Sequence, residues 1–315
     1  MSLVSAESRL LRIVLGQSAA GQFEPGLPLL AGMATEEIFG PTRPIARVGS
    51  VARFQGEDWL LGAASVPLTG GLGEATHRLY RNIFEAATGW HLARIWNYVP
   101  AINDAGPTGL ENYRTFCQGR SLAFEEHHGR QFTTLLPSAS AVGTSSSQLT
   151  VVFAACPAAP RHVENPLQVP AYNYPGEYGP RAPSFARATV LPGQEGTTTA
   201  FVSGTAAIRG HASVAPQNLP AQLECTVENL REISRACGLG PALARRDAAT
   251  RHFKVYLRRP ADQPEVAARL QDAFLRDSDH VSYLHADICR RELLVEIEAT
   301  LLGVNAGRSL VGRHR

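Results

Sequence analysis

The second half of the chain repeats the order of sequence patterns found in the first half, and this repeat constrains the fold more than any other feature. A helical pattern over residues 224–237 matches one over residues 74–87 at a constant offset of 150 positions. The identical pairs are Glu74/Glu224, Thr76/Thr226, Arg81/Arg231, Ile83/Ile233 and Ala86/Ala236. A duplicated unit folds into the same structure twice, so we expect two tandem domains, residues 1–160 and residues 161–315.

Each copy places a strand hairpin before this helix and further strands after it. The matched strand segments are 60–66 with 200–208, 94–99 with 254–259, and 149–155 with 293–299. A second helix is predicted over residues 263–275, and its counterpart in the first copy is expected within residues 107–127. Strands and helices mixed in this order predict an α+β fold, in which each copy is a mixed sheet packed by helices on one face.

The last predicted strand carries two carboxylates on one of its faces. Glu296 and Glu298 are two residues apart, which in a strand puts them on the same side, about 7 Å from each other. Two like charges on a buried face are costly unless one carboxyl holds a proton, and a carboxyl that is neutral near pH 7 can act as a general acid. The alternative interpretation is an edge strand with a solvated acidic face.

The repeat provides an internal comparison for this pair of glutamates. At the matching positions the first copy has Val152 and Ala154. The shared fold therefore does not require carboxylates there. We interpret the C-terminal copy as the one that carries the active site and the N-terminal copy as non-catalytic.

The segment between the two copies, residues 163–188, is rich in proline and also in aromatic and arginine side chains. The latter are Tyr172, Tyr174, Tyr178, Phe185, Arg181 and Arg187. Proline is typical of an interdomain linker, but a linker does not need this concentration of tyrosine and arginine. Guanidinium groups pair with carboxylates and phenols add hydrogen bonds, so the segment is interpreted as a dicarboxylate-binding site.

Composition argues against several classes of protein. The net charge of the 315 residues is +2 and basic residues do not run beyond pairs, so a nucleic-acid surface is not indicated. The five cysteines form no CxxC pair, which argues against a zinc knuckle or a disulfide framework. His127 and His128 are adjacent and lack an evident third ligand, so we predict no metal site. The sequence has no signal pattern and no membrane-spanning apolar run, and the expected location is the cytoplasm.

Six motifs are spread over most of the chain. They are RIWNYVPAIN (94–103), NYRTFCQGR (112–120), LPSASAVG (136–143), VENPLQVPAYNYPGEYGPRAPSFARA (163–188), FVSGTAAIRGH (201–211) and ADICRRELLVEIEA (286–299). In this order they resemble the motifs of the chorismatases, enzymes that split chorismate into pyruvate and either a cyclohexadiene diol or a hydroxybenzoate. The resemblance implies two tandem YjgF/RutC-like (chorismate-mutase-like) units, in agreement with the repeat.

The resemblance also implies roles for individual residues. Glu296 is similar to the family's catalytic acid. The residues similar to the family's ligands for substrate carboxylate or hydroxyl groups are Arg120, Tyr178 and Arg187. Tyr172 and Arg181 show the same nine-residue separation as the last two of these, so they remain a rival pair.

Gly204 and Cys289 are similar to the residues that divide the family by product. A small residue at the first position and cysteine at the second resemble the hydroxybenzoate-forming branch, which implies 3-hydroxybenzoate and leaves 4-hydroxybenzoate open as a second product. Cys289 is expected to steer the substrate ring. A covalent role is disfavoured because the sequence fixes no histidine or aspartate partner for the thiol.

The implied reaction is cleavage of the enolpyruvyl ether of chorismate after Glu296 protonates its methylene carbon, and this chemistry requires no cofactor. The implied partner is the small-molecule substrate, and the chain is expected to be a monomer or a trimer. Two alternatives stay open: a diol-forming chorismate hydrolase, and a YjgF/RutC-type ligand-binding protein without turnover. Imine hydrolysis, found among single-unit relatives, is disfavoured because Val281 stands near the place of their substrate-binding arginine.

Overall fold

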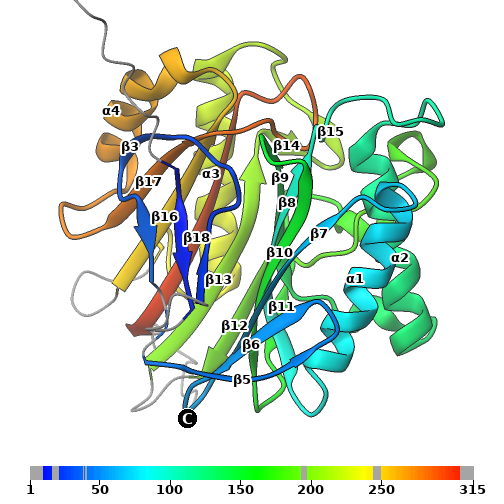
Figure 1. Ribbon diagram of the computed structural model, residues 1–315. Helices are drawn as coiled ribbons and strands as arrows, with labels where there is room; N and C mark the ends of the chain where they lie inside the picture. Colours follow the sequence, from blue (N-terminus) through cyan, green and yellow to red (C-terminus); the bar gives the residue numbers. More distant parts are fainter. Residues whose placement is uncertain are drawn as a thin grey trace, which may run out of the picture.

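Two β-sheets packed face to face form the centre of the computed structural model (Figure 1). The structure describes residues 10–15, 21–37, 39, 41–192, 197–243 and 250–305, with the side chains of 304 and 305 left out. One sheet is built from the first half of the chain. The other is built from the second half together with one N-terminal strand.

The N-terminal unit is a six-stranded sheet in the order β5-β6-β7-β10-β8-β9. Its elements are β5 (Arg43–Val48), β6 (Val51–Gln55), β7 (Leu60–Pro67), α1 (Leu72–Ala86), β8 (His91–Pro100), α2 (Asn112–His128), β9 (Ser138–Thr144) and β10 (Gln148–Cys156). β8 and β9 run parallel, whereas the other neighbours are antiparallel. A parallel pair needs a crossover connection, and α2 provides it.

The C-terminal unit repeats this order strand for strand. Its elements are β11 (Arg161–Val163), β12 (Ala188–Pro192), β13 (Thr197–Ala206), α3 (Leu219–Ala236), β16 (Thr250–Leu257), α4 (Gln263–Ala273), β17 (His280–His285) and β18 (Val295–Asn305). They form the sheet β11-β12-β13-β18-β16-β17, with β16 and β17 as the parallel pair. A small hairpin, β14 (Ile208–Arg209) and β15 (Ala212–Ser213), is inserted before α3. The predicted α+β fold of two tandem units is confirmed.

Four short N-terminal strands lie outside the repeat. They are β1 (Arg12–Val14), β2 (Gln22–Phe23), β3 (Leu29–Gly32) and β4 (Thr35–Glu36). β3 pairs antiparallel with β17 and extends the C-terminal sheet, while β4 pairs with β1 in a small separate sheet. The start of the described chain is therefore shared between the units, and the predicted boundary near residue 160 does not separate it from the C-terminal sheet.

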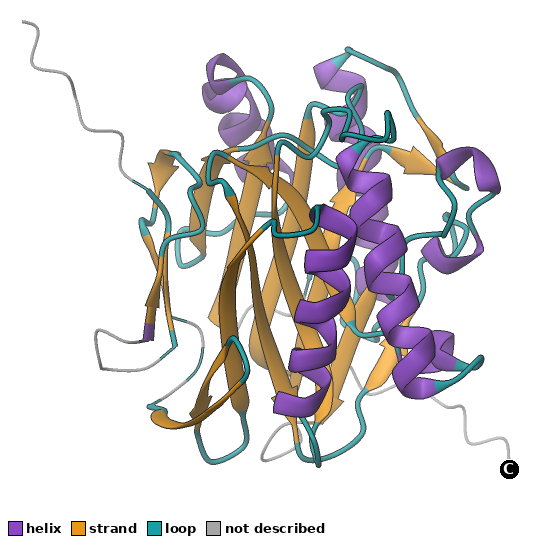
Figure 2. Cartoon of the chain, turned by 45° about the vertical axis from the view of Figure 1, so that its right-hand side comes forward, coloured by secondary structure: helices purple, strands orange, loops and turns teal. Residues whose placement is uncertain are grey.

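The three largest of the four apolar clusters among the described residues hold these layers together. Helices α1 and α2 lie side by side on the outer face of the N-terminal sheet (Figure 2), and α3 and α4 cover the outer face of the other sheet. The third core lies between the two sheets and includes Trp96, Val152, Phe201 and Tyr256. Because residues of both units form this third core, the inner faces of the two sheets are fixed against each other.

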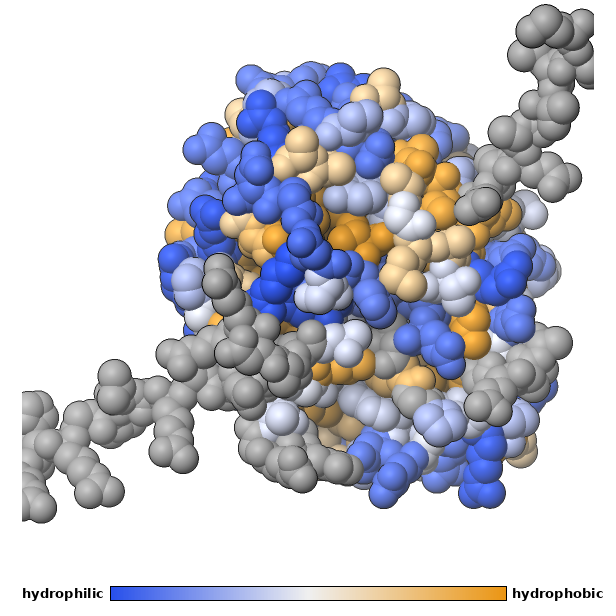
Figure 3. Space-filling model, turned by 90° about the vertical axis from the view of Figure 1, so that its left-hand side faces the viewer, coloured by the Kyte–Doolittle hydropathy of each residue, from blue (hydrophilic) through white to orange (hydrophobic). Residues whose placement is uncertain are grey.

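Most of the surface on the left of Figure 1 is hydrophilic, and its apolar residues form separate patches (Figure 3). Among the described residues, the exposed large hydrophobic side chains are Leu10, Met33, Leu122 and Leu135. Scattered exposed residues of this kind are normal and need no functional explanation.

The sequence patterns did not predict β9 and β17. β9 has the sequence SASAVGT and is buried along most of its length, so it lacks the alternation of polar and apolar residues that marks a half-buried strand. The helix expected within residues 107–127 is α2. It begins within the expected range and ends one residue beyond it.

Candidate active site

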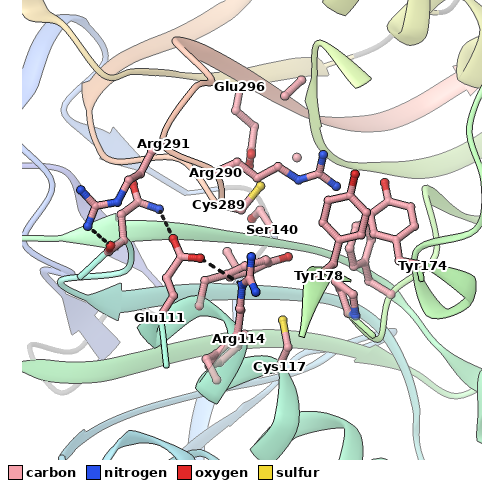
Figure 4. Close-up of a pocket in the computed structure, with 18 of the residues that line it drawn as sticks. Glu111, Arg114, Cys117, Ser140, Tyr174, Tyr178, Cys289, Arg290, Arg291 and Glu296 are labelled. Carbon is pink, nitrogen blue, oxygen red and sulfur yellow. Dashed lines mark hydrogen bonds and ion pairs between the residues drawn. The ribbon is translucent and has the colours of Figure 1, made fainter. Parts of the chain in front are cut away.

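A cavity of about 530 Å³ opens where the two units meet (Figure 4). Its walls come from α2 and the loop before it, from β9, from the segment between the units, and from β13 and the turn that leads into β18. All six site residues that the sequence predicts line it: Arg120, Tyr178, Arg187, Gly204, Cys289 and Glu296.

Glu298 lies behind the cavity wall in a network of buried charges. Its Oε2 accepts a hydrogen bond from Arg94 Nη2 at 2.8 Å, and its Oε1 accepts one from Trp96 Nε1 at 2.7 Å and lies 3.0 Å from Lys254 Nζ. Burial alone would raise the pKa of this carboxyl. The charges of Lys254 and Arg94 outweigh burial and hold the pKa at about 2, so Glu298 is ionised at neutral pH.

Glu296, two residues earlier on β18, faces the cavity and is only 3% exposed. Burial and then the negative charge of Glu298 raise its pKa to about 8, against the smaller opposing effects of Arg94 and Arg187. At pH 7 this carboxyl therefore holds a proton. The two neighbouring glutamates divide into one acid and one carboxylate, which is the arrangement that a general acid requires.

A bulge in β13 makes room for the Glu296 carboxyl. The register of β13 against β18 shifts between Val202 and Thr205, whereas β7 against β10 is regular at the matching place in the N-terminal unit. Gly204 lies within this bulge, and a Cβ atom there would overlap the carboxyl of Glu296. Bulges of this kind often re-aim side chains beside active sites, and here a glycine leaves the acid its space.

Arg120 is brought to the cavity by the close packing of α2 on α1. A Cβ atom at Gly119 would overlap the backbone carbonyl of Gly73, so the two helices approach closely at this point. The guanidinium of Arg120 lies over the rings of Tyr80 and Phe124, at 5.2 and 5.5 Å. Its Nε and Nη2 are buried without a hydrogen-bond partner. Unpartnered buried donors are costly, which points to an anionic ligand as the missing acceptor.

Arg187 is the second buried guanidinium beside the cavity. Its Nη2 donates to the Val169 carbonyl at 3.2 Å and to the Tyr174 hydroxyl at 2.7 Å, and the group lies 5.1 Å from the ring of Phe185. Its Nε is buried and has no hydrogen-bond partner. Arg187 is therefore fixed in place and still has a donor to offer.

Arg290 and two tyrosines, Tyr174 and Tyr178, also line the cavity, and the Arg290 side chain extends toward the tyrosines (Figure 4). The Arg290 guanidinium lies 4.1 Å from the ring centre of Tyr178 and 5.4 Å from that of Tyr174. The Tyr178 hydroxyl is 3.1 Å from His211 Nδ1. Arg290 was not predicted from the sequence, although it stands next to Cys289. Tyr174 was predicted only as one of the aromatic residues of the segment 163–188.

The Cys289 thiol faces the cavity and is neutral. Burial, and then the charge of Glu296, raise its pKa well above the ordinary value of a thiol. Cys117 lines the same cavity, and burial raises its pKa to about 12. A protonated thiol is a poor nucleophile, so the structure favours a role for Cys289 in shaping the cavity over a covalent role.

The rival pair lies outside the cavity. Arg181 forms an ion pair with Glu125 and donates to Ser121 Oγ at 3.2 Å, both on α2. Tyr172 packs against the apolar core of the N-terminal unit. Arg181 thus anchors the segment between the units, whereas Tyr178 and Arg187 face the cavity.

The cavity belongs to both units, which corrects the prediction that placed the site in the C-terminal unit alone. Arg120 on α2 and Ser140 on β9 come from the N-terminal unit, and Glu296 comes from the C-terminal unit. Sequence periodicity shows which face of a strand is apolar, but it does not show which faces of two units meet.

Other classes of site find little support in the described part of the chain. No three His, Cys, Asp or Glu side chains gather there as metal ligands. His127 and His128 stack on Phe84 and Phe124 instead, with ring centres 4.7 and 5.9 Å apart. None of its helices is long and apolar enough to cross a membrane.

Fold and site together define a class: tandem α+β proteins with a cavity between the units that is lined by arginines and a neutral carboxyl. Comparisons with known proteins agree. The family model described as "Chorismatase FkbO/Hyg5-like, N-terminal" matches residues 41–155. A 3-hydroxybenzoate synthase of Streptomyces hygroscopicus is 39% identical over 250 residues, which are 76% of this chain and 73% of the relative.

A chorismatase of the same organism is 37% identical over 278 residues, which cover 84% of this chain and 78% of the relative. A chorismatase crystal structure matches with 30% identity and a TM-score of 0.74, over 96% of this chain and 95% of that one. The chain belongs to the chorismatase family of enzymes. The chorismatase structure and this chain share the fold of two tandem α+β units over almost their whole lengths.

Proposed function

We propose that this protein cleaves the enolpyruvyl ether of chorismate to give pyruvate and 3-hydroxybenzoate. The observation that carries the proposal is a protonated Glu296 carboxyl that faces a cavity with two buried arginines. The similarity to a 3-hydroxybenzoate synthase supports this product.

The first step is binding of a dianion. Chorismate carries two carboxylates, and Arg120 and Arg187 offer buried N–H groups that would donate hydrogen bonds to them. Tyr178 adds a phenol for a carboxylate or hydroxyl group of the substrate. The negative charge of the ligand further disfavours ionised Glu296, so substrate binding helps to keep the acid protonated.

The second step is transfer of the Glu296 proton to the terminal methylene carbon. The electron pair of the enol double bond forms the new C–H bond and leaves an oxocarbenium ion at the ether carbon. Protonation of carbon is slow, so a positioned acid with a raised pKa is what this step needs. The carboxylate of Glu296 and the cation then form a close ion pair inside the cavity.

The product depends on which oxygen captures the cation. In the hydroxybenzoate route the ring hydroxyl adds to the cation, and its proton returns to the Glu296 carboxylate. The bond between that oxygen and the ring then breaks, so the oxygen leaves as part of pyruvate. The ring becomes aromatic by losing one C–H proton, and the former ether oxygen, which stays on the ring, takes up one proton as the phenol, so no water is consumed. In the diol route a water molecule adds instead. The glycine at 204 and the neutral thiol at 289 would set the room around the ring and so favour the first route.

The test is incubation of the purified protein with chorismate, followed by chromatography of pyruvate and of aromatic products. Equal amounts of pyruvate and 3-hydroxybenzoate are expected. Pyruvate together with a diol would support the hydrolase alternative. Chorismate that binds but stays intact would support a binding protein without turnover and would end the proposal.

A further inference from the structure

Four charged side chains form a continuous buried chain behind the cavity wall: Glu36, Lys254, Glu298 and Arg94. Each of them is at most 3% exposed. Lys254 Nζ lies 2.6 Å from Glu36 Oε2 and 3.0 Å from Glu298 Oε1, and Arg94 Nη2 lies 2.8 Å from Glu298 Oε2. Two anions and two cations alternate, so the chain is neutral as a whole.

The members of this chain come from three separate parts of the fold. Arg94 is on β8 of the N-terminal unit, while Lys254 and Glu298 face each other on β16 and β18 of the C-terminal unit. Glu36 is on β4, in the N-terminal segment that lies outside the repeat. Lys254 is also the only lysine among the 315 residues. The N-terminal segment therefore supplies a charge that neither unit contains by itself.

Stability alone does not account for this arrangement. Burying an ion costs several kcal/mol, and well-packed apolar residues in place of a buried ion pair are often as stable or more stable. At the equivalent place in the N-terminal unit, Ala154 lies opposite Arg94 and fills the sheet without a carboxylate. The charges behind the cavity therefore call for a functional explanation.

On the basis of the proposed function, we propose that Glu36, Lys254 and Arg94 are positioning residues that hold Glu298 as a permanent carboxylate, so that Glu296 alone keeps the proton. Two buried carboxyls side by side can exchange roles, since burial favours the neutral form of each. The two cations remove this ambiguity. Glu36 then balances the second charge, so that the field of Lys254 does not ionise Glu296 as well.

Several titratable and charged groups face this region from the elements packed around it. Around Glu296 they are Glu298 on β18, Arg94 on β8, Lys254 and Tyr256 on β16, Arg187 before β12, Cys289 before β18, and Arg120 on α2. His252 Nδ1 lies 3.9 Å from Glu36 Oε1, and burial lowers the pKa of this imidazole, so it is neutral at pH 7. Variants at Glu36 and Lys254 leave all the others in place.

The decisive experiment uses Glu36→Gln, Lys254→Met and the double variant of the full chain. The readout is the pH at which kcat/KM for chorismate begins to fall as Glu296 loses its proton. Glu36→Gln leaves an extra positive charge, so the fall should move to lower pH. Lys254→Met leaves an extra negative charge and should move it to higher pH. A charge removed at about 10 Å in an effective dielectric constant of about 20 is worth roughly one pH unit.

The double variant makes the test specific. It restores a neutral chain, so its pH profile should return to that of the parent protein although two residues have been lost. A second readout does not depend on turnover: the infrared C=O band of a protonated carboxyl, assigned to Glu296 by its loss in Glu296→Gln, should titrate with the same shifts. If Lys254→Met does not fold, the direction in which Glu36→Gln shifts the pH profile is by itself a test of the inference.

A matched control distinguishes an effect on the protonation of Glu296 from a general loss of folding stability. Arg251 and Asp279 form another buried ion pair of the C-terminal unit, with Arg251 Nε 2.7 Å from Asp279 Oδ1, and neither residue lines the cavity. Asp279→Asn should lower the melting temperature without moving the pH profile. If Glu36→Gln behaves in the same way, the inference is overturned. If the parent protein leaves chorismate intact, the proposed function fails, while the infrared titration still tests the inference.

Discussion

Strands β10 and β18 occupy the same place in their sheets, yet they meet the opposite sheet with different chemistry. β10 puts Ala154 opposite Arg94, and β18 puts Glu298 opposite Lys254. Each unit thus offers a cation at the equivalent point, and both cations converge on the single carboxylate that the C-terminal unit supplies. A symmetric scaffold thus becomes a buried charge centre through Glu298, which has no counterpart in the first unit, and Glu36, which lies outside the repeat.

The next position along the same face shows the second difference. Val152 of β10 is packed between the sheets and is 1% exposed, whereas Glu296 of β18 has a cavity in front of it. The strands themselves are alike. The space comes from the neighbouring strand, where β13 bulges at Gly204 and β7 does not. The candidate site therefore needed a carboxyl and a distortion of the sheet, and either alone would be unproductive.

Among the substitutions that test this comparison, replacement of Glu296 should have the largest effect on activity. Glu296→Gln keeps the shape of the side chain but removes its transferable proton, so kcat should fall by roughly 10³-fold or more. Chorismate affinity should stay within a few-fold of the parent value, and isothermal titration would measure it. A variant that keeps a tenth of the parent kcat would show that another group delivers the proton.

Introducing a carboxyl at the equivalent position of the N-terminal unit, Val152, tests the same comparison in the unit that lacks the acid. Val152→Glu puts a carboxyl between the sheets, where the adjoining void has a volume of only about 10 Å³, and it should cost about 3–5 kcal/mol in the free energy of unfolding. Urea denaturation would measure this cost. The control Val152→Met keeps the site apolar and should cost less than about 1.5 kcal/mol. Equal stability of the two variants would mean that this unit also accommodates an acid.

The sequence predicted the duplication, and it singled out Glu296 as the candidate acid, for a physical reason. Period-two alternation marks a strand face, and the repeat shows that Val152 suffices where Glu296 stands. The sequence could not show that Arg120 and Glu296 share a cavity, because that depends on how the two sheets pack. It also could not separate Arg181 from Arg187, since both have the same local chemistry and differ only in the partner that the fold gives them.

The network behind the wall was equally hidden. Glu36 lies in a segment whose sequence has no strong periodic pattern, and Lys254 stands out as the single lysine of the chain, at the start of the predicted strand 254–259. Their meeting with Glu298 requires β4, β16 and β18 to come together. Contacts between segments so far apart cannot be predicted from local patterns in a single sequence.

Replacement of Arg120, the proposed substrate-binding arginine, should have the next largest effect on activity. Arg120→Met removes unpartnered buried donors, so kcat/KM should fall roughly 100-fold, mostly through KM, because a charge-assisted hydrogen bond to the substrate is lost. The melting temperature should stay equal or rise, since an unpaired buried charge disappears. Arg181→Met is the matched control, as its guanidinium pairs with Glu125 outside the cavity. A similar loss in both variants would argue against a binding role for Arg120.

Glu296 and Glu298 should also change the free energy of unfolding with pH in opposite directions. The folded-state pKa of Glu296 is raised to about 8, so it favours the folded state below the ordinary carboxyl pKa of 4.5, and this contribution is lost as pH rises towards 8. The folded-state pKa of Glu298 is lowered to about 2, so its contribution is present above 4.5 and is lost as pH falls towards 2.

Glu296→Gln should therefore lose less stability than the parent between pH 5 and pH 8. Melting temperatures of the two proteins over this range would measure the difference, and parallel curves would contradict the raised pKa of Glu296.

The smallest effect on rate should come from Cys289→Ala. The thiol is neutral and faces the cavity, so its removal should leave kcat within about threefold, since no bond to sulfur forms in the proposed reaction. The extra room beside the ring should admit water to the cation, and the diol share of the products should rise at the expense of 3-hydroxybenzoate. Chromatography of the product mixture measures this ratio directly. A loss of rate as large as that of Glu296→Gln, with no change in products, would instead mean that the sulfur takes part in the chemistry. Cys289 would then be a catalytic residue, and the proposal that it only shapes the cavity beside the acid would be wrong.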